Sequence, residues 1–303
     1  MDRPLIKPPR LRQGDLLGVV APAGIFERQL LDAGLRKWEA LGFRVREGAS
    51  LHERHRYFAG TDETRAEEFN SMLRDPEVAA IVCARGGYGA MRLAARIDWA
   101  AARARPRVFL GFSDISFLHC AFQKEVGQVV FHGPMAANLA FLSQPPERDR
   151  FLLDLLMDPD ARPTITDPGL RALRPGRAAG PLVGGCLSIV HVTLGTRWEV
   201  ETRGCILLLE DHREPAYRID RMLTHLKLAG KLDGIAGLAL GNLDLPLDEV
   251  APIVDEVLGD APIPLLAGLP VGHGKVNVPL PLGVLAEIDT SAPCLRFLEG
   301  AVA

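Results

Sequence analysis

The sequence lacks the features that mark membrane and nucleic-acid-binding proteins. No apolar run approaches the ~18–20 residues that a membrane-spanning helix needs, and residues 1–9 contain no apolar core of a signal peptide. Lysine and arginine (35) nearly balance aspartate and glutamate (38), so no excess of positive charge favours nucleic acid or an anionic membrane. We therefore expect neither of these as a partner.

Cysteine is scarce, and its spacing indicates no disulfide framework. The five cysteines are an odd number, and no two form a Cys-x-x-Cys pair. Several lie in apolar runs, as Cys83 and Cys205 do, where free cysteine behaves as a small buried hydrophobe. Because free thiols are typical of reducing compartments, we predict a cytoplasmic protein.

What the sequence does contain is typical of a globular protein. Of its 303 residues, 48% are hydrophobic and 24% are charged, which is enough apolar material to fold without a disulfide or a metal. At ~150 residues per domain, the length predicts about two domains.

The N-terminal half alternates apolar strands with amphipathic helices. This order predicts an α/β fold with a doubly wound, mostly parallel sheet, which we place in a first domain at residues 1–150. The predicted strands cover 16–21, 43–45, 78–84 and 108–111, and the predicted helices cover 27–41, 61–74 and segments that start near 89 and 114.

Prolines and arginines interrupt this pattern after residue 150. We interpret residues 151–179 as a linker or crossover and residues 180–303 as a smaller second domain. Its predicted elements are strands at 204–210 and 235–240, a helix at 217–228 and a β-rich tail at 282–298.

A serine lies where the predicted strand 108–111 must turn into a helix. Such a turn lifts the side chain of Ser113 out of the sheet, and backbone N–H groups at the helix start can stabilise an oxyanion. The pattern Gly-x-Ser-x-Gly is absent, since residues 111–115 read Gly-Phe-Ser-Asp-Ile. The alternative is that Ser113 or Asp114 only caps the helix.

A glycine-rich turn follows the predicted strand 78–84 and reads Arg-Gly-Gly-Tyr-Gly at 85–89. Glycines at this place let the backbone approach a ligand closely. Neither the Walker pattern nor the dinucleotide-binding pattern is present. The turn could therefore complete an oxyanion hole, bind a phosphate or serve only as a tight turn.

Glu210 ends the apolar strand 204–210 and further acidic residues follow it, at a place where open α/β sheets put their sites. Glu210 and Glu214 are both candidates for the acid of a catalytic triad; a metal cluster or a solvated loop is the alternative use of this segment. Metal binding finds little support in the spacing, because His52 and His55 lie in a charged stretch typical of a surface.

His273 is the candidate general base, because it lies in a loop between two glycines that allow close positioning. His212 is its main competitor. Ser113, Glu210 and His273 would then form a triad in which an acceptor holds one ring nitrogen and the other takes the serine proton. Three histidines fall within predicted helices or strands and are expected to be structural: His119, His191 and His225.

Seven segments carry a resemblance to one family. They are Arg-Tyr-Phe-Ala-Gly-Thr at 56–61, Ala-Arg-Gly-Gly-Tyr-Gly-Ala at 84–90, Gly-Phe-Ser-Asp at 111–114, His-Gly-Pro-Met at 132–135, Leu-Leu-Glu-Asp at 208–211, Tyr-Arg-Ile-Asp-Arg-Met-Leu at 217–223 and Gly-His at 272–273. In this order along the chain they resemble the LD-carboxypeptidase family of serine peptidases. Seven ordered matches are far more specific than any one of them.

The resemblance implies a nucleophile at Ser113, a triad acid at Glu210 rather than Glu214, and a base at His273. It also implies an oxyanion hole from the backbone N–H groups of Gly87 and Asp114. In the family, the serine lies on the N-terminal domain and the acid and base lie on the C-terminal domain. We therefore expect the site at the interface between the two.

The implied reaction is hydrolysis, through an acyl-enzyme, of the L,D amide bond that releases terminal D-alanine from a murein tetrapeptide during cell-wall recycling. The resemblance implies a small peptide substrate, no metal and no organic cofactor, and a homodimer. From its charge and position alone, we add Arg85 as the partner of the substrate's terminal carboxylate.

The family usually has Gly-Gly-Asn-Leu where this chain has Gly-Gly-Cys-Leu at 184–187. The replacement at Cys186 bears on specificity more than on catalysis, because it leaves the triad intact. Two alternatives to the main interpretation are an immunity peptidase of the microcin C type, which cleaves a peptidyl-nucleotide amide, and a module that binds phosphate or carboxylate at 85–89 without catalysis.

Overall fold

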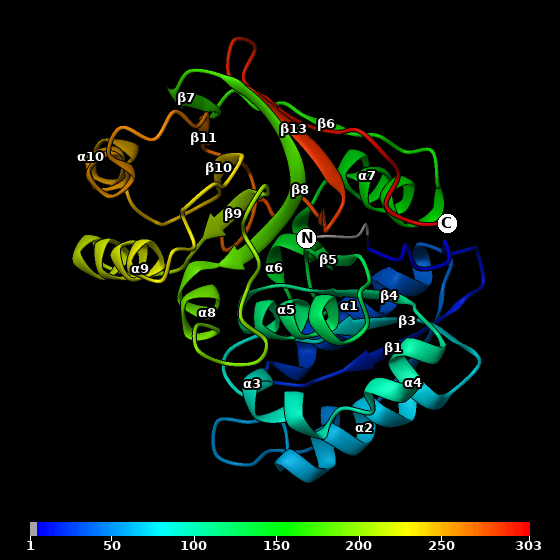
Figure 1. Cartoon of the computed structure of the whole chain (residues 1–303). Helices are drawn as coiled ribbons and strands as arrows, with labels where there is room; N and C mark the ends of the chain where they lie inside the picture. Colours follow the sequence, from blue (N-terminus) through cyan, green and yellow to red (C-terminus); the bar gives the residue numbers. More distant parts are fainter. Residues whose placement is uncertain (1–4) are drawn as a thin grey trace.

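Two sheets form the frame of the molecule (Figure 1). The structure is a computed structural model that describes residues 5–303. Within this range the first sheet has six strands, in the order β12 (Leu280–Leu282), β5 (Val130–His132), β4 (Val108–Gly111), β3 (Val78–Cys83), β1 (Leu16–Val20) and β2 (Arg44–Glu47). Strands β1 to β5 are parallel, so the predicted α/β fold with a mostly parallel sheet is confirmed.

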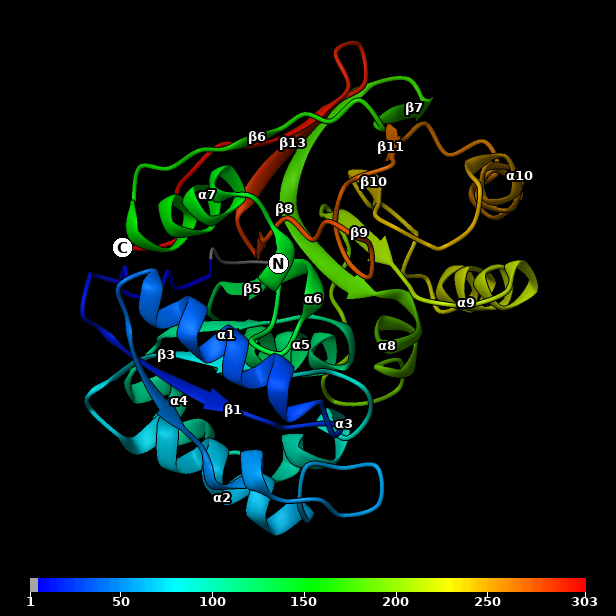
Figure 2. The ribbon, with the colours of Figure 1, turned by 180° about the vertical axis from the view of Figure 1, so that it is seen from behind.

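Helices cover both faces of the first sheet, with α1 and α2 on opposite sides (Figures 1 and 2). They are α1 (Arg28–Ala40), α2 (Asp62–Arg74), α3 (Ala90–Leu93), α4 (Trp99–Ala104), α5 (Ser116–Glu125) and α6 (Leu139–Ser143), with short 3₁₀ turns η1 (Ala49–His52), η2 (Ala94–Arg96) and η3 (Ser113–Ile115). The hydroxyl of Thr61 caps α2 by accepting from the N–H of Thr64 at 3.2 Å. The predicted helix after residue 89 is broken in two, because Asp98 begins a new helix by capping α4.

The second sheet has eight strands within the described residues. Their order is β6 (Thr164–Ile165), β14 (Cys294–Phe297), β13 (Leu285–Asp289), β8 (Arg177–Cys186), β9 (Ile206–Glu210), β10 (Gly237–Leu240), β11 (Leu265–Ala267) and β7 (Arg171–Arg174). Strands β8 to β11 are parallel and the outer ones antiparallel. The accompanying helices are α7 (Pro146–Met157), α8 (Leu187–Val192), α9 (Ala216–Leu228) and α10 (Leu247–Leu258). Among residues 5–303, none of the helices has the length and apolar character needed to cross a bilayer.

Two segments differ from the sequence-based expectation. The segment 151–179 supplies the edge strands β6 and β7 and the start of β8, so it is part of the second sheet. Strand β12, from the C-terminal part of the chain, pairs antiparallel with β5 of the first sheet. This pairing satisfies backbone groups that β5 would otherwise leave open at a sheet edge.

The two sheets share one core. On β9, Ile206 and Leu208 pack into the cluster that also holds the strands of the first sheet. Leu207 and Leu209 point to the other face and pack against α8, α9 and α10. The continuous apolar run of β9 therefore reflects burial on both of its faces. The packing of β9 on both sides holds the two sheets together. All five cysteines are free and buried, as predicted.

Gly34 allows α1 to pack closely on the loop that follows β5. A Cβ at this position would overlap the carbonyl oxygen of Ala136, whose N–H donates to the Cys83 carbonyl at the end of β3. We expect Gly34→Ala to lower the free energy of unfolding by ~1–3 kcal/mol through overpacking, as measured by urea denaturation. Arg36→Ala, on the exposed side of α1, should change it by no more than ~0.5 kcal/mol. A Gly34→Ala variant as stable as the wild type would contradict the close approach.

Candidate active site

The carboxyl ends of parallel strands from both sheets meet at one cleft. Ser113 follows β4, Glu210 is the last residue of β9, and His273 lies in the loop after β11. Ligand and catalytic groups of open α/β sheets are found at this end of the strands. The fold thus brings His273 next to Ser113 although 160 positions separate them.

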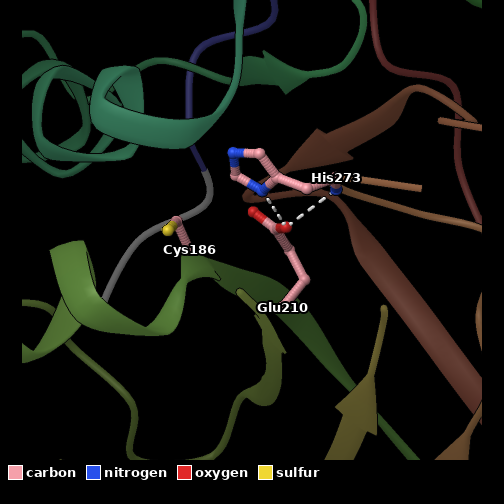
Figure 3. A group of neighbouring side chains, drawn as sticks. All are labelled: Cys186, Glu210 and His273. Atoms are coloured by element: carbon pink, nitrogen blue, oxygen red, sulfur yellow. Dashed lines mark hydrogen bonds and ion pairs between the residues drawn. The ribbon is translucent and has the colours of Figure 1, made fainter. Parts of the chain in front are cut away.

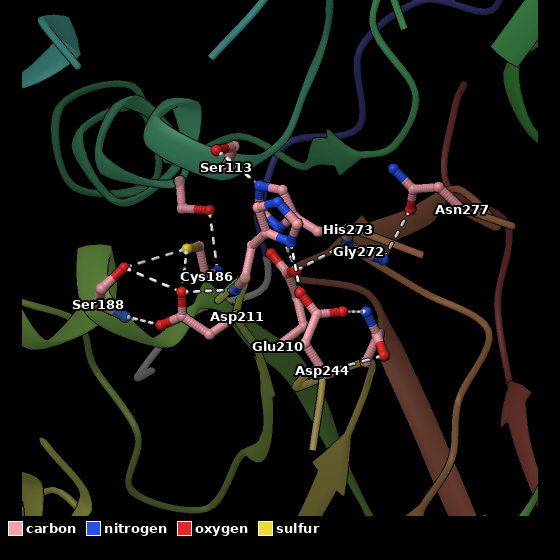
Figure 4. Close-up of polar contacts among 12 residues, drawn as sticks. Ser113, Cys186, Ser188, Glu210, Asp211, Asp244, Gly272, His273 and Asn277 are labelled. Carbon is pink, nitrogen blue, oxygen red and sulfur yellow. Dashed lines mark hydrogen bonds and ion pairs between the residues drawn. The ribbon is translucent and has the colours of Figure 1, made fainter. Parts of the chain in front are cut away.

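Ser113, His273 and Glu210 form a hydrogen-bonded relay (Figure 4). The Ser113 Oγ lies 2.9 Å from His273 Nε2. On the other side of the ring, Nδ1 lies 2.7 Å from Glu210 Oε2, which also accepts from the His273 backbone N–H at 3.1 Å. With Nδ1–H donating to the carboxylate, Nε2 is free to accept the serine proton.

The carboxylate of Glu210 is fully buried yet ionised. Burial by itself raises its pKa, but hydrogen bonds from the imidazoles of His132 and His273 outweigh burial and lower the pKa to about 2. His132 Nε2 lies 3.4 Å from Oε1, the oxygen that His273 does not use. Both oxygens of the buried carboxylate are therefore paired.

The charge of Glu210 in turn acts on His273. Burial lowers the pKa of this imidazole, but the hydrogen bond and the negative charge of Glu210 outweigh it, so the pKa of His273 is raised. Gly272 makes the approach possible: its φ is 94°, and a Cβ there would overlap Glu210 Oε2. The glycine before the histidine is thus required by the contact itself.

Ser113 occupies a strained backbone position. Its φ is 64°, in the left-handed region that disfavours residues with a Cβ. The helix-cap alternative is wrong, because neither side chain caps η3. The carboxylate of Asp114 instead accepts from the N–H of Ala90 at 2.8 Å, and burial raises the pKa of Asp114 to about 6. Asp114 thereby ties the serine turn to the start of α3.

The glycine-rich turn lies directly against the serine. A Cβ on Gly86 would come within 2.7 Å of the Ser113 Cβ and 3.2 Å of the Asp114 nitrogen, so the turn requires glycine for this approach. Gly87 has a φ of 103°, and within residues 5–303 its N–H has no hydrogen-bond partner. The exposed Arg85 donates from Nη1 to the Ile25 carbonyl.

A cavity of about 290 Å³ opens over the relay. Its walls are formed by the glycine turn, the serine turn, the loop after β5 and two histidines. They comprise Ala84, Arg85, Gly86, Gly87, Phe112, Ser113, Met135, Ala137, Asn138, His212 and His273.

The competing candidates have other partners. His212 stacks on His273, with ring centroids 5.0 Å apart and planes 7° from parallel, but its Nδ1 bonds to Asp244. Glu214, just before α9, pairs with Arg218 in its first turn at 3.0 Å. Glu210 and His273 are therefore the acid and histidine that reach Ser113.

The remaining histidines are placed as expected. His52 and His55 are exposed. His119 is fully buried, and the rings of His191 and His225 contact each other with centroids 4.8 Å apart.

Cys186 lies near the relay at the end of β8 (Figure 3). Its ligand atom and those of Glu210 and His273 lie within 4.8 Å of one another, the only such group of candidate metal ligands among the described residues. Burial and the nearby charges of Glu210 and Asp211 raise the pKa of the thiol well above its usual value. The thiolate that a metal needs is therefore disfavoured, and Glu210 and His273 are already bonded to each other.

The role of His132 does not follow from the sequence, where it is only part of the segment 132–135. The available signal was its place: it ends β5, in register with Gly111 of β4, next to the predicted serine turn. Its contact with Glu210, 78 positions away, could not be seen from the sequence.

Taken together, the strained serine, the histidine and the buried carboxylate define a serine hydrolase of the nucleophilic class. Comparison with family models gives the family. Residues 17–133 match the LD-carboxypeptidase N-terminal domain, and residues 179–288 match the LD-carboxypeptidase C-terminal domain. The chain belongs to the LD-carboxypeptidase family, and the predicted carboxypeptidase class is confirmed.

Individual relatives agree with this assignment. A probable murein peptide carboxypeptidase of Bacillus subtilis is 39% identical, over 94% of this chain and 92% of the relative. A murein tetrapeptide carboxypeptidase of Pseudomonas aeruginosa is 34% identical, over 90% and 92%. The structure of MccF in complex with glutamyl sulfamoyl guanosine is 23% identical and superposes with a TM-score of 0.91, over 98% of this chain and 99% of that one, which confirms the fold.

Replacing the buried acid should change both the rate and the pH dependence of serine reactivity. We expect Glu210→Gln to slow labelling of Ser113 by a fluorophosphonate at least ~100-fold. The base must be neutral to act, so the acid limb of the profile reports the pKa of His273. Because Glu210 raises that pKa, the limb should lie above ~6.5 in the wild type and move to lower pH in the variant. Glu214→Gln should leave the labelling rate and the position of the acid limb unchanged. A larger loss of labelling rate in Glu214→Gln than in Glu210→Gln would make Glu214 the acid.

Removing the second imidazole tests the role of His132. His132→Phe leaves Glu210 Oε1 unpaired and should slow fluorophosphonate labelling by ~10-fold, the cost of losing a hydrogen bond to a buried charge. His119→Phe is the matched control: this neighbouring ring is equally buried, and within the described residues neither of its nitrogens has a partner. Equal effects of the two substitutions would show that His132 acts only through packing.

Proposed function

We propose that this protein is a serine LD-carboxypeptidase that releases terminal D-alanine from murein tetrapeptides. The observation that carries the proposal is the relay from Ser113 Oγ through His273 to the buried Glu210, with distances of 2.9 and 2.7 Å. The relatives named murein peptide and murein tetrapeptide carboxypeptidase support the substrate class.

In the proposed mechanism, Ser113 Oγ attacks the carbonyl carbon of the L-configured residue, and its proton passes to His273 Nε2. The tetrahedral intermediate collapses when His273 returns this proton to the nitrogen of the departing D-alanine, leaving an ester on Ser113. Water then attacks the ester, again with His273 as base, and the shortened peptide leaves. Glu210 stays ionised throughout and stabilises the imidazolium that forms twice.

The backbone N–H groups of Gly87 and Asp114 are the proposed oxyanion hole. Supporting this, Gly86 brings the turn against Ser113 and the Asp114 nitrogen, and amides at the start of a helix are unpaired along the chain. Such preorganised donors stabilise the charge that develops on the carbonyl oxygen.

Arg85 is the proposed partner of the substrate's terminal carboxylate. It lines the cavity over Ser113, and among residues 5–303 only one of its guanidinium nitrogens is engaged, with the Ile25 carbonyl. A guanidinium has five N–H donors, so several stay available for a carboxylate.

A second candidate keeps the same relay but cleaves a peptidyl-nucleotide amide. It is favoured by the likeness to MccF, whose structure holds a glutamyl sulfamoyl guanosine, and by an exposed pair of tyrosines. Tyr88 belongs to the glycine turn, and its ring centroid lies 6.1 Å from that of Tyr57; both rings are exposed and form a surface on which a base could stack.

The resemblance also leads us to propose a cytoplasmic location and a homodimer. Five buried thiols fit a reducing compartment.

The decisive assay is D-alanine release from a murein tetrapeptide, with wild type beside Ser113→Ala. We expect release by the wild type and a loss of at least ~1000-fold in the variant, because the nucleophile is gone. Release that persists in the variant would rule out Ser113. A wild type that labels with a fluorophosphonate but releases no D-alanine would direct the search to the peptidyl-nucleotide amide.

A further inference from the structure

A second pair of histidine and carboxylate lies beside the relay. The ring of His212 stacks on that of His273, and its Nδ1 bonds to Asp244 Oδ2 just as the Nδ1 of His273 bonds to Glu210. The proposed mechanism uses only one of these two pairs.

Two residues that hold the second pair have an unfavourable, left-handed backbone conformation. Arg213 and Asp244 have φ values of 59° and 55°, and such conformations cost of order 1 kcal/mol each in a residue with a side chain. Within residues 5–303, only four residues other than glycine have a positive φ, and Ser113 is another of them. Strain is therefore concentrated at this cleft.

Asp244 is positioned and charged. Its carboxylate accepts from Asn242 Nδ2 at 2.6 Å and from the backbone N–H of Arg213 at 3.1 Å. Burial by itself raises the pKa of Asp244, but these hydrogen bonds and that from His212 outweigh it and lower the pKa. The aspartate is therefore an anion that orients His212.

The other edge of His212 is free. Its side chain is 42% exposed and lines the cavity over Ser113, and Nε2 has no hydrogen-bond partner in the part of the chain that the structure describes. An imidazolium has an N–H on each nitrogen. With Asp244 on one side, a second carboxylate at Nε2 would complete its hydrogen bonds.

The position of the leaving group identifies the carboxylate that would bind His212 Nε2. His273 must give its proton to the leaving amine, so the leaving residue lies against His273. The carboxylate of an amino acid is one carbon from its amine. His212, which stacks on His273 and lines the cavity, is the side chain next to that place.

We propose that His212, held by Asp244, binds the carboxylate of the departing D-alanine and so restricts cleavage to the end of a peptide. This inference rests on the proposed function, and it adds a second group for the carboxylate that Arg85 is proposed to bind; both residues line the same cavity. Each of the two stacked rings has its own carboxylate partner, Asp244 or Glu210.

The test compares two substrates that differ only at this carboxylate: a murein tetrapeptide ending in D-alanine and the same peptide ending in D-alaninamide. For the acid, His212→Ala should lower kcat/KM by about 10- to 100-fold, mainly through KM. For the amide the change should stay below about threefold, since the lost contact does not exist there. Asp244→Asn should show the same dependence on the substrate. His52→Ala, at an exposed histidine, is the control and should leave kcat/KM unchanged for both the acid and the amide.

Fluorophosphonate labelling of Ser113 separates the remaining outcomes. Labelling at the wild-type rate in His212→Ala is expected, and a loss of labelling would mean that His212 acts through His273, which overturns the inference. If His212→Ala lowers kcat/KM equally for the acid and the amide, or for neither, the inference is overturned while the proposed function stays intact. A wild type that labels but cleaves neither peptide overturns the proposed function and the inference together.

Discussion

One buried carboxylate organises the site. Glu210 is fully buried at the end of the apolar strand β9, and it remains ionised because three donors reach it: the Nδ1–H and backbone N–H of His273, and Nε2 of His132. An uncompensated charge at this depth would be far less stable than in water. The loop containing Gly272, the end of β5 and the end of β9 must therefore keep their relative positions.

The shared core supplies that rigidity. Ser113 comes from the first sheet, while Glu210 and His273 come from the second, so a relay with bonds below 3 Å requires the sheets to be fixed against each other. Packing of one face of β9 into the core of the first sheet does this. Strand β12 adds a covalent continuation, since the chain passes from the His273 loop directly into the edge of the first sheet.

The same cleft explains why small and strained residues gather there. Gly86 and Gly272 are glycines because another residue's atoms occupy the place of a Cβ, and Ser113 holds a left-handed backbone so that its hydroxyl clears the sheet. Cys186 lies beside the relay at the end of β8, with its thiol directed to Asp211 at 3.6 Å. It takes no part in the hydrogen bonds of the relay.

The sequence by itself determined the local features. Apolar runs identify the strands, Thr61 marks the start of a helix, and a serine after a strand or a histidine between glycines identifies candidates, because each depends on neighbours within a few residues. The family resemblance then selected Glu210 and His273.

Only the tertiary structure decided that His132 shares the carboxylate of Glu210, that His212 pairs with Asp244, and that β12 joins the first sheet. Each of these is a contact between segments distant in the chain, and such contacts depend on how the strands are ordered and packed, which no local pattern of residues encodes.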